Sequence, residues 1–100
     1  MTPDKSAADC QSLAEIRAQI DRIDQAMVEL LVTRGSYVLA AARFKQSEAE
    51  VTAPQRVEQV IARVRALAEA RGASADVVER VYRELIAAFT DAEREHWRQQ

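Results

Sequence analysis

An apolar stripe with helical spacing runs through the first half of the chain. It begins after Ser12, whose hydroxyl forms a capping box with the carboxylate of Glu15. Apolar residues then recur at steps of three and four: Leu13, Ile16, Ile20, Ile23, Met27, Leu30 and Leu31. No proline interrupts the pattern, so we predict one helix over residues 12–46, about 50 Å long. So long a helix exceeds what a compact monomer of 100 residues needs, which indicates packing against a partner chain.

A second helix is predicted after a break in the pattern. Residues 47–53 have no period, so we expect a loop there. Thr52 and Gln55 form a second capping box, and Pro54 suits the first helical turn. The helix should end at Gly72. Its predicted buried stripe is Val57, Val60, Ile61, Val64, Leu67 and Ala68.

The last helix should start at Ser74 or Asp76, either of which can cap it, and should run to about Trp97. Its predicted stripe is Val78, Val81, Leu85, Ala88, Phe89, Ala92 and His96. The composition supports helices throughout, because the chain has 48% hydrophobic residues but only two glycines and two prolines. We predict an all-α chain with a single domain over residues 1–100, in which residues 1–11 form a flexible N-terminal segment.

Charge and location follow from the same composition. A net charge of −2 argues against nucleic acid or an acidic membrane as a partner. No stretch approaches the roughly 18 apolar residues of a membrane span. The N-terminus is polar, and the single Cys10 cannot form an intramolecular disulfide. We therefore expect a cytoplasmic protein.

The usual catalytic groups are scarce. One histidine, His96, and one cysteine, Cys10, make a metal cluster or a Cys/His pair improbable. No P-loop or dinucleotide-binding fingerprint occurs. We expect neither a metal nor an organic cofactor, so that any catalysis works by positioning and electrostatics.

Two cations share the buried face of the first predicted helix. Arg34 takes the next position on the stripe after Leu30, and Lys45 follows eleven residues later. Eleven residues rotate a helix by about three turns, which places both cations on one face with backbones roughly 16 Å apart. Their long side chains can bracket a small, multiply anionic ligand. The alternative is that they pair with acids such as Glu48 or Glu84, or extend to solvent.

Arg17 supplies a geometric argument. It precedes Arg34 by 17 residues, about 25 Å along one helix and rotated by about 100°. Both cannot touch the same small ligand within one chain. If Arg17 serves that ligand site, it comes from a second chain; the alternative is a solvated surface arginine.

The chain resembles the all-helical chorismate mutase family, and in particular its isochorismate pyruvate lyase branch. Two runs are the most specific: Arg43-Phe44-Lys45-Gln46-Ser47-Glu48-Ala49 and Ala53-Pro54-Gln55-Arg56-Val57. Further matches lie at residues 9–10, 13–17, 20–24, 37–38, 41–42 and 97–99. The resemblance covers residues 9–97.

The resemblance implies three helices per chain interlocked into a homodimer with two equivalent sites. Arg34, Lys45 and Arg56 would line each site, and Arg17 would enter from the other subunit. The substrates would be the dicarboxylates chorismate or isochorismate, converted to prephenate or to salicylate and pyruvate. Both reactions are pericyclic and need no nucleophile. Arginine forks suit the carboxylates, and the Lys45 ammonium suits the breaking ether bond.

Two positions bear on the branch. Val57 stands where mutases of the family carry a glutamate that binds the ring hydroxyl of chorismate, which favours the lyase. Glu93 stands where related lyases and mutases carry glutamine, although some mutases have glutamate. A charged carboxylate cannot donate to the ether oxygen, so we hypothesise that Glu93 works protonated. The alternative is a salt bridge from Glu93 to Arg17 or Arg56.

The resemblance thus favours an isochorismate pyruvate lyase with some chorismate mutase activity, in which Lys45, Glu93 and Arg34 would be catalytic. A dedicated chorismate mutase is the first alternative. The second is a non-catalytic helical dimer that binds a protein partner.

Overall fold

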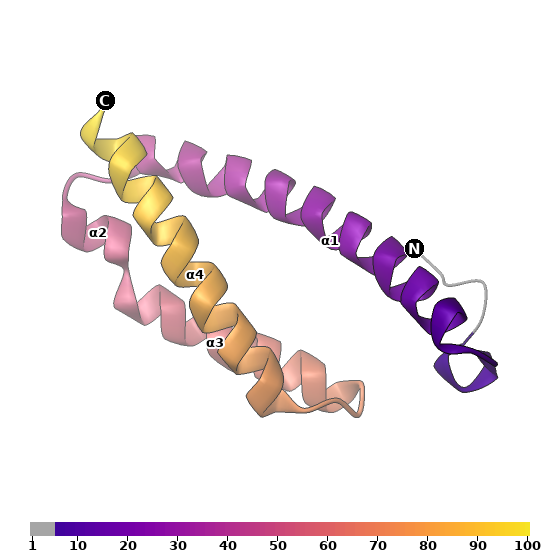
Figure 1. Ribbon diagram of the computed structural model, residues 1–100. Helices are drawn as coiled ribbons and strands as arrows, with labels where there is room; N and C mark the ends of the chain where they lie inside the picture. Colours follow the sequence, from indigo (N-terminus) through magenta and orange to yellow (C-terminus); the bar gives the residue numbers. More distant parts are fainter. Residues whose placement is uncertain (1–5) are drawn as a thin grey trace. The chain divides into compact units, whose positions relative to one another are not determined.

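The computed structural model describes residues 6–100, and regular structure among them is helical throughout. Two short 3-10 helices are η1 (Ala7–Asp9) and η2 (Ala42–Phe44). The α-helices are α1 (Leu13–Ala41), α2 (Glu48–Thr52), α3 (Pro54–Ala70) and α4 (Ala75–Arg98), coloured along the chain in Figure 1. The predicted all-α class with three long helices is confirmed, and α2 is an addition to it. None of these helices is long and apolar enough to cross a membrane.

The chain divides into two compact units between Ser36 and Tyr37, inside α1. Whether the whole chain acts as a single domain stays a prediction. The predicted flexible segment lies partly outside the described residues, which begin at Ser6, and residues 7–9 of it form η1.

The start of α1 follows its capping box. Ser12 Oγ accepts from the backbone N–H of Glu15 at 3.1 Å, and Glu15 Oε2 accepts in return from the backbone N–H of Gln11 at 2.8 Å. The predicted end at residue 46 is wrong. The helix ends at Ala41, tightens into η2, and gives way to extended backbone at Lys45 (φ −94°, ψ 138°). Lys45 therefore lies outside the long helix, and the prediction that it shares a helix face with Arg34 is wrong.

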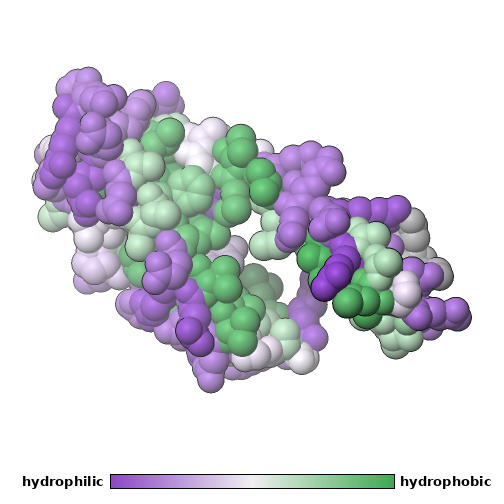
Figure 2. Space-filling model, in the orientation of Figure 1, coloured by the Kyte–Doolittle hydropathy of each residue, from purple (hydrophilic) through white to green (hydrophobic). Residues whose placement is uncertain are grey.

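The first unit carries a helical stripe that it cannot cover by itself. Ile16, Ile20, Ile23, Met27 and Leu30 are between 39% and 69% exposed in the single chain. A lone helix has no second layer against which to bury an apolar face. Figure 2 shows large apolar areas open at the surface.

In the second unit, α4 packs along α3 and α2 (Figure 1). The core consists of small and branched side chains: Ala42, Val51, Val60, Ile61, Val64 and Ala68. Four of the six stripe positions predicted for α3 are therefore confirmed, but Leu67 is 56% exposed and Val57 is half-buried. The Arg83 guanidinium on α4 binds both carboxylate oxygens of Glu58 on α3, at 3.0 Å each.

The face that α4 turns inward agrees with the prediction only in part, since Val78, Leu85 and Phe89 of the predicted stripe are half-buried. Val81, Ala88, Ala92 and His96 are exposed in the single chain, whereas Glu93 is buried. Phe89 and Trp97, one turn before and after Glu93, are half-buried. Near its end, the inward face of α4 therefore contains Phe89, Glu93 and Trp97, which share one side of the helix. A search for apolar residues alone does not find this face, because charged residues are seldom buried.

The loop predicted over residues 47–53 is wrong, because α2 occupies most of it. Ser47 Oγ accepts from the backbone N–H of Glu50 at 3.3 Å, and Glu50 Oε2 accepts from that of Gln46 at 2.6 Å. The Ser-x-x-Glu sequence is that of a capping box, with the glutamate bonded to the N–H one residue before the cap. The helix has only five residues, so it shows no hydrophobic period.

At the ends of α3 and the start of α4, one predicted cap is wrong and the others are confirmed. The Thr52 capping box is wrong: Thr52 Oγ1 donates to the carbonyl of Glu48, and α3 is preceded by Ala53 in the left-handed region (φ 41°). Pro54 in the first turn is confirmed. The helix α3 ends at Ala70, its C-cap is Arg71, and the predicted stop Gly72 follows in the left-handed conformation (φ +70°). Ser74 Oγ caps α4 by accepting from the N–H of Val77.

Candidate active site around Lys45 and Glu93

A half-buried ion pair joins two candidate residues that lie 48 positions apart. Lys45 Nζ lies 3.0 Å from Glu93 Oε2, and the two side chains are 24% and 7% exposed. Lys45 follows η2, and Glu93 comes from the last turns of α4. This pair brings two of the five predicted site residues into direct contact.

Lys45 is held at further points. Its ammonium also donates to the carbonyl of Glu50 at 3.2 Å, and its own carbonyl accepts from Trp97 Nε1 at 3.0 Å. The backbone N–H of Lys45 donates to the carbonyl of Ala42, which closes η2. The position of this cation is therefore fixed by hydrogen bonds at both ends of the residue.

The partner of Glu93 differs from those considered on sequence grounds. The alternatives were Arg17 and Arg56 for Glu93, and Glu48 or Glu84 for Lys45, and the structure pairs the two residues with each other. A buried carboxylate is costly without a partner, and the ammonium of Lys45 supplies one. The pairing is an interaction of the charged carboxylate, so Glu93 can donate a hydrogen bond only after it takes up a proton.

The remaining site residues are distributed over the two units. Arg56 lies in the first turn of α3 and is exposed, and no ion pair or hydrogen bond joins it to Lys45 or Glu93 within residues 6–100. Arg34 is half-buried and Arg17 is exposed, both on the part of α1 in the first unit. Because α1 is one continuous helix from Leu13 to Ala41, the separation of about 25 Å between these two arginines holds.

A second ion pair lies at the same end of α4. Arg98 Nε donates to Glu48 Oε1 at 2.6 Å, which ties α4 to the start of α2. The hydrogen bond from this guanidinium lowers the pKa of the Glu48 carboxyl. Trp97 and Arg98 therefore both contact the segment that carries Lys45. Sequence reasoning missed these two contacts, although the spacing of Glu93 and Trp97 by four residues signals a shared face.

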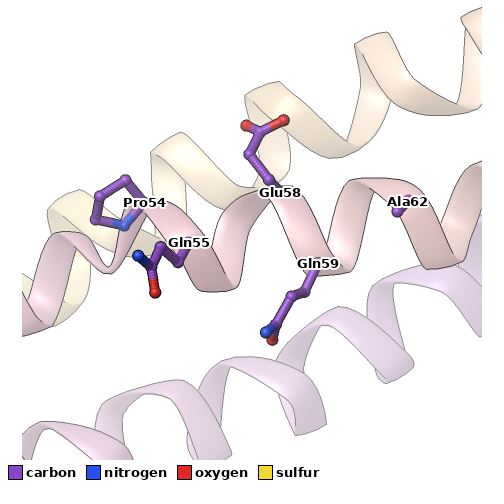
Figure 3. Close-up of a pocket in the computed structure, with 5 residues that line it drawn as sticks. All are labelled: Pro54, Gln55, Glu58, Gln59 and Ala62. Atoms are coloured by element: carbon purple, nitrogen blue, oxygen red, sulfur yellow. The ribbon is translucent and has the colours of Figure 1, made fainter.

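The surface of α3 has a shallow pocket with a different character. Figure 3 shows its lining: Pro54, Gln55, Glu58, Gln59 and Ala62. Its one charged group is the Glu58 carboxylate, which Arg83 already binds and whose pKa the Arg83 hydrogen bond lowers. A pocket with a carboxylate and no cation does not suit an anionic ligand. The Lys45–Glu93 pair is the better candidate for the binding site of an anion, since the Lys45 ammonium can bind one.

Comparisons with known proteins bear on this arrangement. Residues 16–94 match the family model for chorismate mutase type II. The chain is also 41% identical over 95 residues to an isochorismate pyruvate lyase of Pseudomonas aeruginosa, across 95% of this chain and 94% of the relative.

The chain belongs to the chorismate mutase type II family.

Membership in this family confirms the resemblance inferred from the two specific sequence runs, and the relative confirms the likeness to the lyase branch. The matched region includes α2 and α3 and most of α1 and α4, and all five predicted site residues lie within it. Within residues 6–100, no group of three or more His, Cys, Asp or Glu side chains is arranged to hold a metal ion. The roles of individual site residues in this family member stay predictions.

Proposed function

We propose that this member of the chorismate mutase type II family is an isochorismate pyruvate lyase, with a lesser ability to convert chorismate to prephenate. The observation that carries the proposal is the Lys45–Glu93 pair, which places a cation and a titratable acid side by side in a largely buried setting. The 41% identity to an isochorismate pyruvate lyase supports the choice of substrate. Val57 supports it too, because an apolar side chain cannot bind the ring hydroxyl of chorismate.

The reaction balances without any group from the protein. The ether C–O bond of isochorismate breaks, and one ring hydrogen moves to the methylene of the enolpyruvyl group. The ring becomes salicylate and the side chain leaves as pyruvate, so neither water nor a nucleophile is consumed. The protein has to hold a compact conformer and stabilise negative charge on the ether oxygen.

Lys45 and Glu93 divide this work. The Lys45 ammonium, which donates to Glu93 Oε2 and to the Glu50 carbonyl, offers its third N–H to the ether oxygen, where a preorganised cation contributes on the order of a hundredfold in rate. Glu93 donates a hydrogen bond to the ether oxygen once it is protonated. Arg34 and Arg56 bind substrate carboxylates as bidentate forks.

A pH–rate profile tests the role of Glu93. The activity of Glu93→Gln should depend less on pH than that of the unmodified enzyme, because an amide donates a hydrogen bond at every pH whereas a carboxyl group donates only when protonated. A variant profile that coincides with that of the unmodified enzyme would remove this role.

The dimer belongs to the same proposal. Three helices per chain form an intertwined homodimer in which each α1 covers the apolar stripe of its partner. The support is the exposed stripe of α1, since burying one such Ile, Leu or Met side chain contributes about 1.5–3 kcal/mol. Arg17 then reaches the site of the partner subunit, in line with its separation from Arg34.

A dedicated mutase has one observation in its favour, the Glu93 that some mutases of the family carry. Two assays of the same enzyme preparation separate these readings: salicylate fluorescence with isochorismate, and prephenate formation with chorismate. Salicylate formed alone, or faster than prephenate, supports the lyase; prephenate alone supports the mutase; and neither product supports the non-catalytic dimer. The cytoplasmic location stays a prediction.

A further inference from the structure

One face of the last turns of α4 holds both ends of Lys45. Glu93 Oε2 accepts from the ammonium at 3.0 Å, and Trp97 Nε1 donates to the backbone carbonyl at 3.0 Å. The two holding residues are four positions apart, so they stack on one side of the helix with an axial rise of about 6 Å. That rise suits the reach of a lysine from its carbonyl to its ammonium. A single face of α4 therefore fixes both the backbone carbonyl and the ammonium group of Lys45.

The segment around Lys45 has little stability of its own. It consists of the three-residue η2, the extended Lys45 and the five-residue α2. Helices this short do not persist in water without tertiary contacts. Their contacts here are to α4: both η2 and α2 pack on it, and Val51 is buried.

Arg98 adds a second tether from the next residue of α4. Its guanidinium donates to Glu48 at 2.6 Å, at the first residue of α2. Arg94, one turn earlier, pairs with Asp91 inside α4, and its attraction for Glu48 is weaker than the hydrogen bond that Arg98 makes. The two arginines are thus a natural pair of test and control positions.

We propose that Trp97, assisted by Arg98, is a positioning residue that holds residues 42–52 so that the Lys45 ammonium lies where the substrate ether oxygen binds. The proposal rests on the proposed function, because it assigns Lys45 to that oxygen. Trp97 acts through Lys45 and contacts no substrate atom. The indole N–H distinguishes this role from simple packing, since any large aromatic ring can pack but only tryptophan offers this donor.

The kinetic test uses Trp97→Phe, which keeps a ring and removes the donor. It should lower kcat for salicylate formation by about tenfold, with KM changed by less than about twofold. The reason is that a displaced cation loses more of its stabilisation of the transition state than of its attraction for the bound substrate. In a Lys45→Ala background the same substitution should have no further effect, since its route of action is gone. An equal loss in both backgrounds, or no loss in either, overturns the proposal.

A second test needs no substrate. Amide hydrogen exchange of Trp97→Phe should be faster over residues 45–52 and unchanged over residues 54–70. Arg98→Gln should act in the same direction, and the control Arg94→Gln, which removes only a weaker attraction for Glu48, should have a smaller effect on residues 45–52. An unchanged segment, or faster exchange spread evenly over α3, contradicts the holding role. If the unmodified chain forms neither product, the proposed function fails, and this exchange measurement still decides whether Trp97 holds the segment.

Discussion

Replacing Lys45 by methionine should destabilise the fold more than replacing Glu93 by glutamine. Lys45→Met keeps a long side chain but removes the charge. The Glu93 side chain, which is only 7% exposed, then has no other hydrogen-bond donor within residues 6–100. Glu93→Gln instead leaves an amide whose oxygen still accepts from Lys45. The lysine is also 24% exposed and keeps its bond to the carbonyl of Glu50.

The burial of the two side chains sets the magnitudes. Removing one partner of a fully buried ion pair costs about 3–5 kcal/mol. Because Lys45 is partly open to water, we expect about 2–3 kcal/mol for Lys45→Met and about 1 kcal/mol or less for Glu93→Gln. The double variant Lys45→Met/Glu93→Leu should recover most of the larger loss, since two apolar groups leave no unpaired charge.

Urea unfolding followed by circular dichroism measures these differences. All variants must be compared at one chain concentration, because association stabilises the folded state by mass action. The reasoning is refuted if Glu93→Gln costs as much as Lys45→Met, or if the double variant is the least stable of the three.

Three other predictions follow from separate features. Mixing Arg17→Ala chains with Lys45→Ala chains should restore activity, because a heterodimer with shared sites has one intact site; no recovery contradicts the crossing of Arg17. Arg83→Gln should weaken the acid dependence of the urea midpoint: Arg83 holds the pKa of Glu58 below its usual value of 4.5, so that stabilisation is present above this pH and lost as pH falls below it. An unchanged acid slope contradicts that pairing. Gly72→Ala should cost about 1 kcal/mol in urea unfolding, because φ is +70° there and the space around it is open; a neutral change contradicts the backbone argument.

The sequence was most informative where single residues stop or start a helix. Pro54, Gly72 and Ser74 each act through their own backbone or hydroxyl. The start and end of α3 and the start of α4 could therefore be predicted from these residues and their sequence neighbours. The five-residue α2 could not be found from periodicity. Its capping residues, Ser47 and Glu50, were a readable signal that the absence of a hydrophobic period obscured.

The site depends on contacts that no local pattern encodes. Lys45 and Glu93 are 48 positions apart, and only the packing of η2 and α2 on α4 brings them together. The apolar stripe predicted for α4 left Glu93 out, and Glu93 became a candidate only through the family resemblance. Arg17 and Arg34 are a different case, since helix geometry alone shows that one chain cannot bring both to one small ligand.

The most direct measurement is the product formed from isochorismate by the purified chain, followed by salicylate fluorescence beside the Lys45→Ala variant. The account predicts salicylate with an equal amount of pyruvate from the unmodified chain, and a rate lowered on the order of a hundredfold or more in the variant. No salicylate at high enzyme concentration, or the same rate from Lys45→Ala, would contradict it.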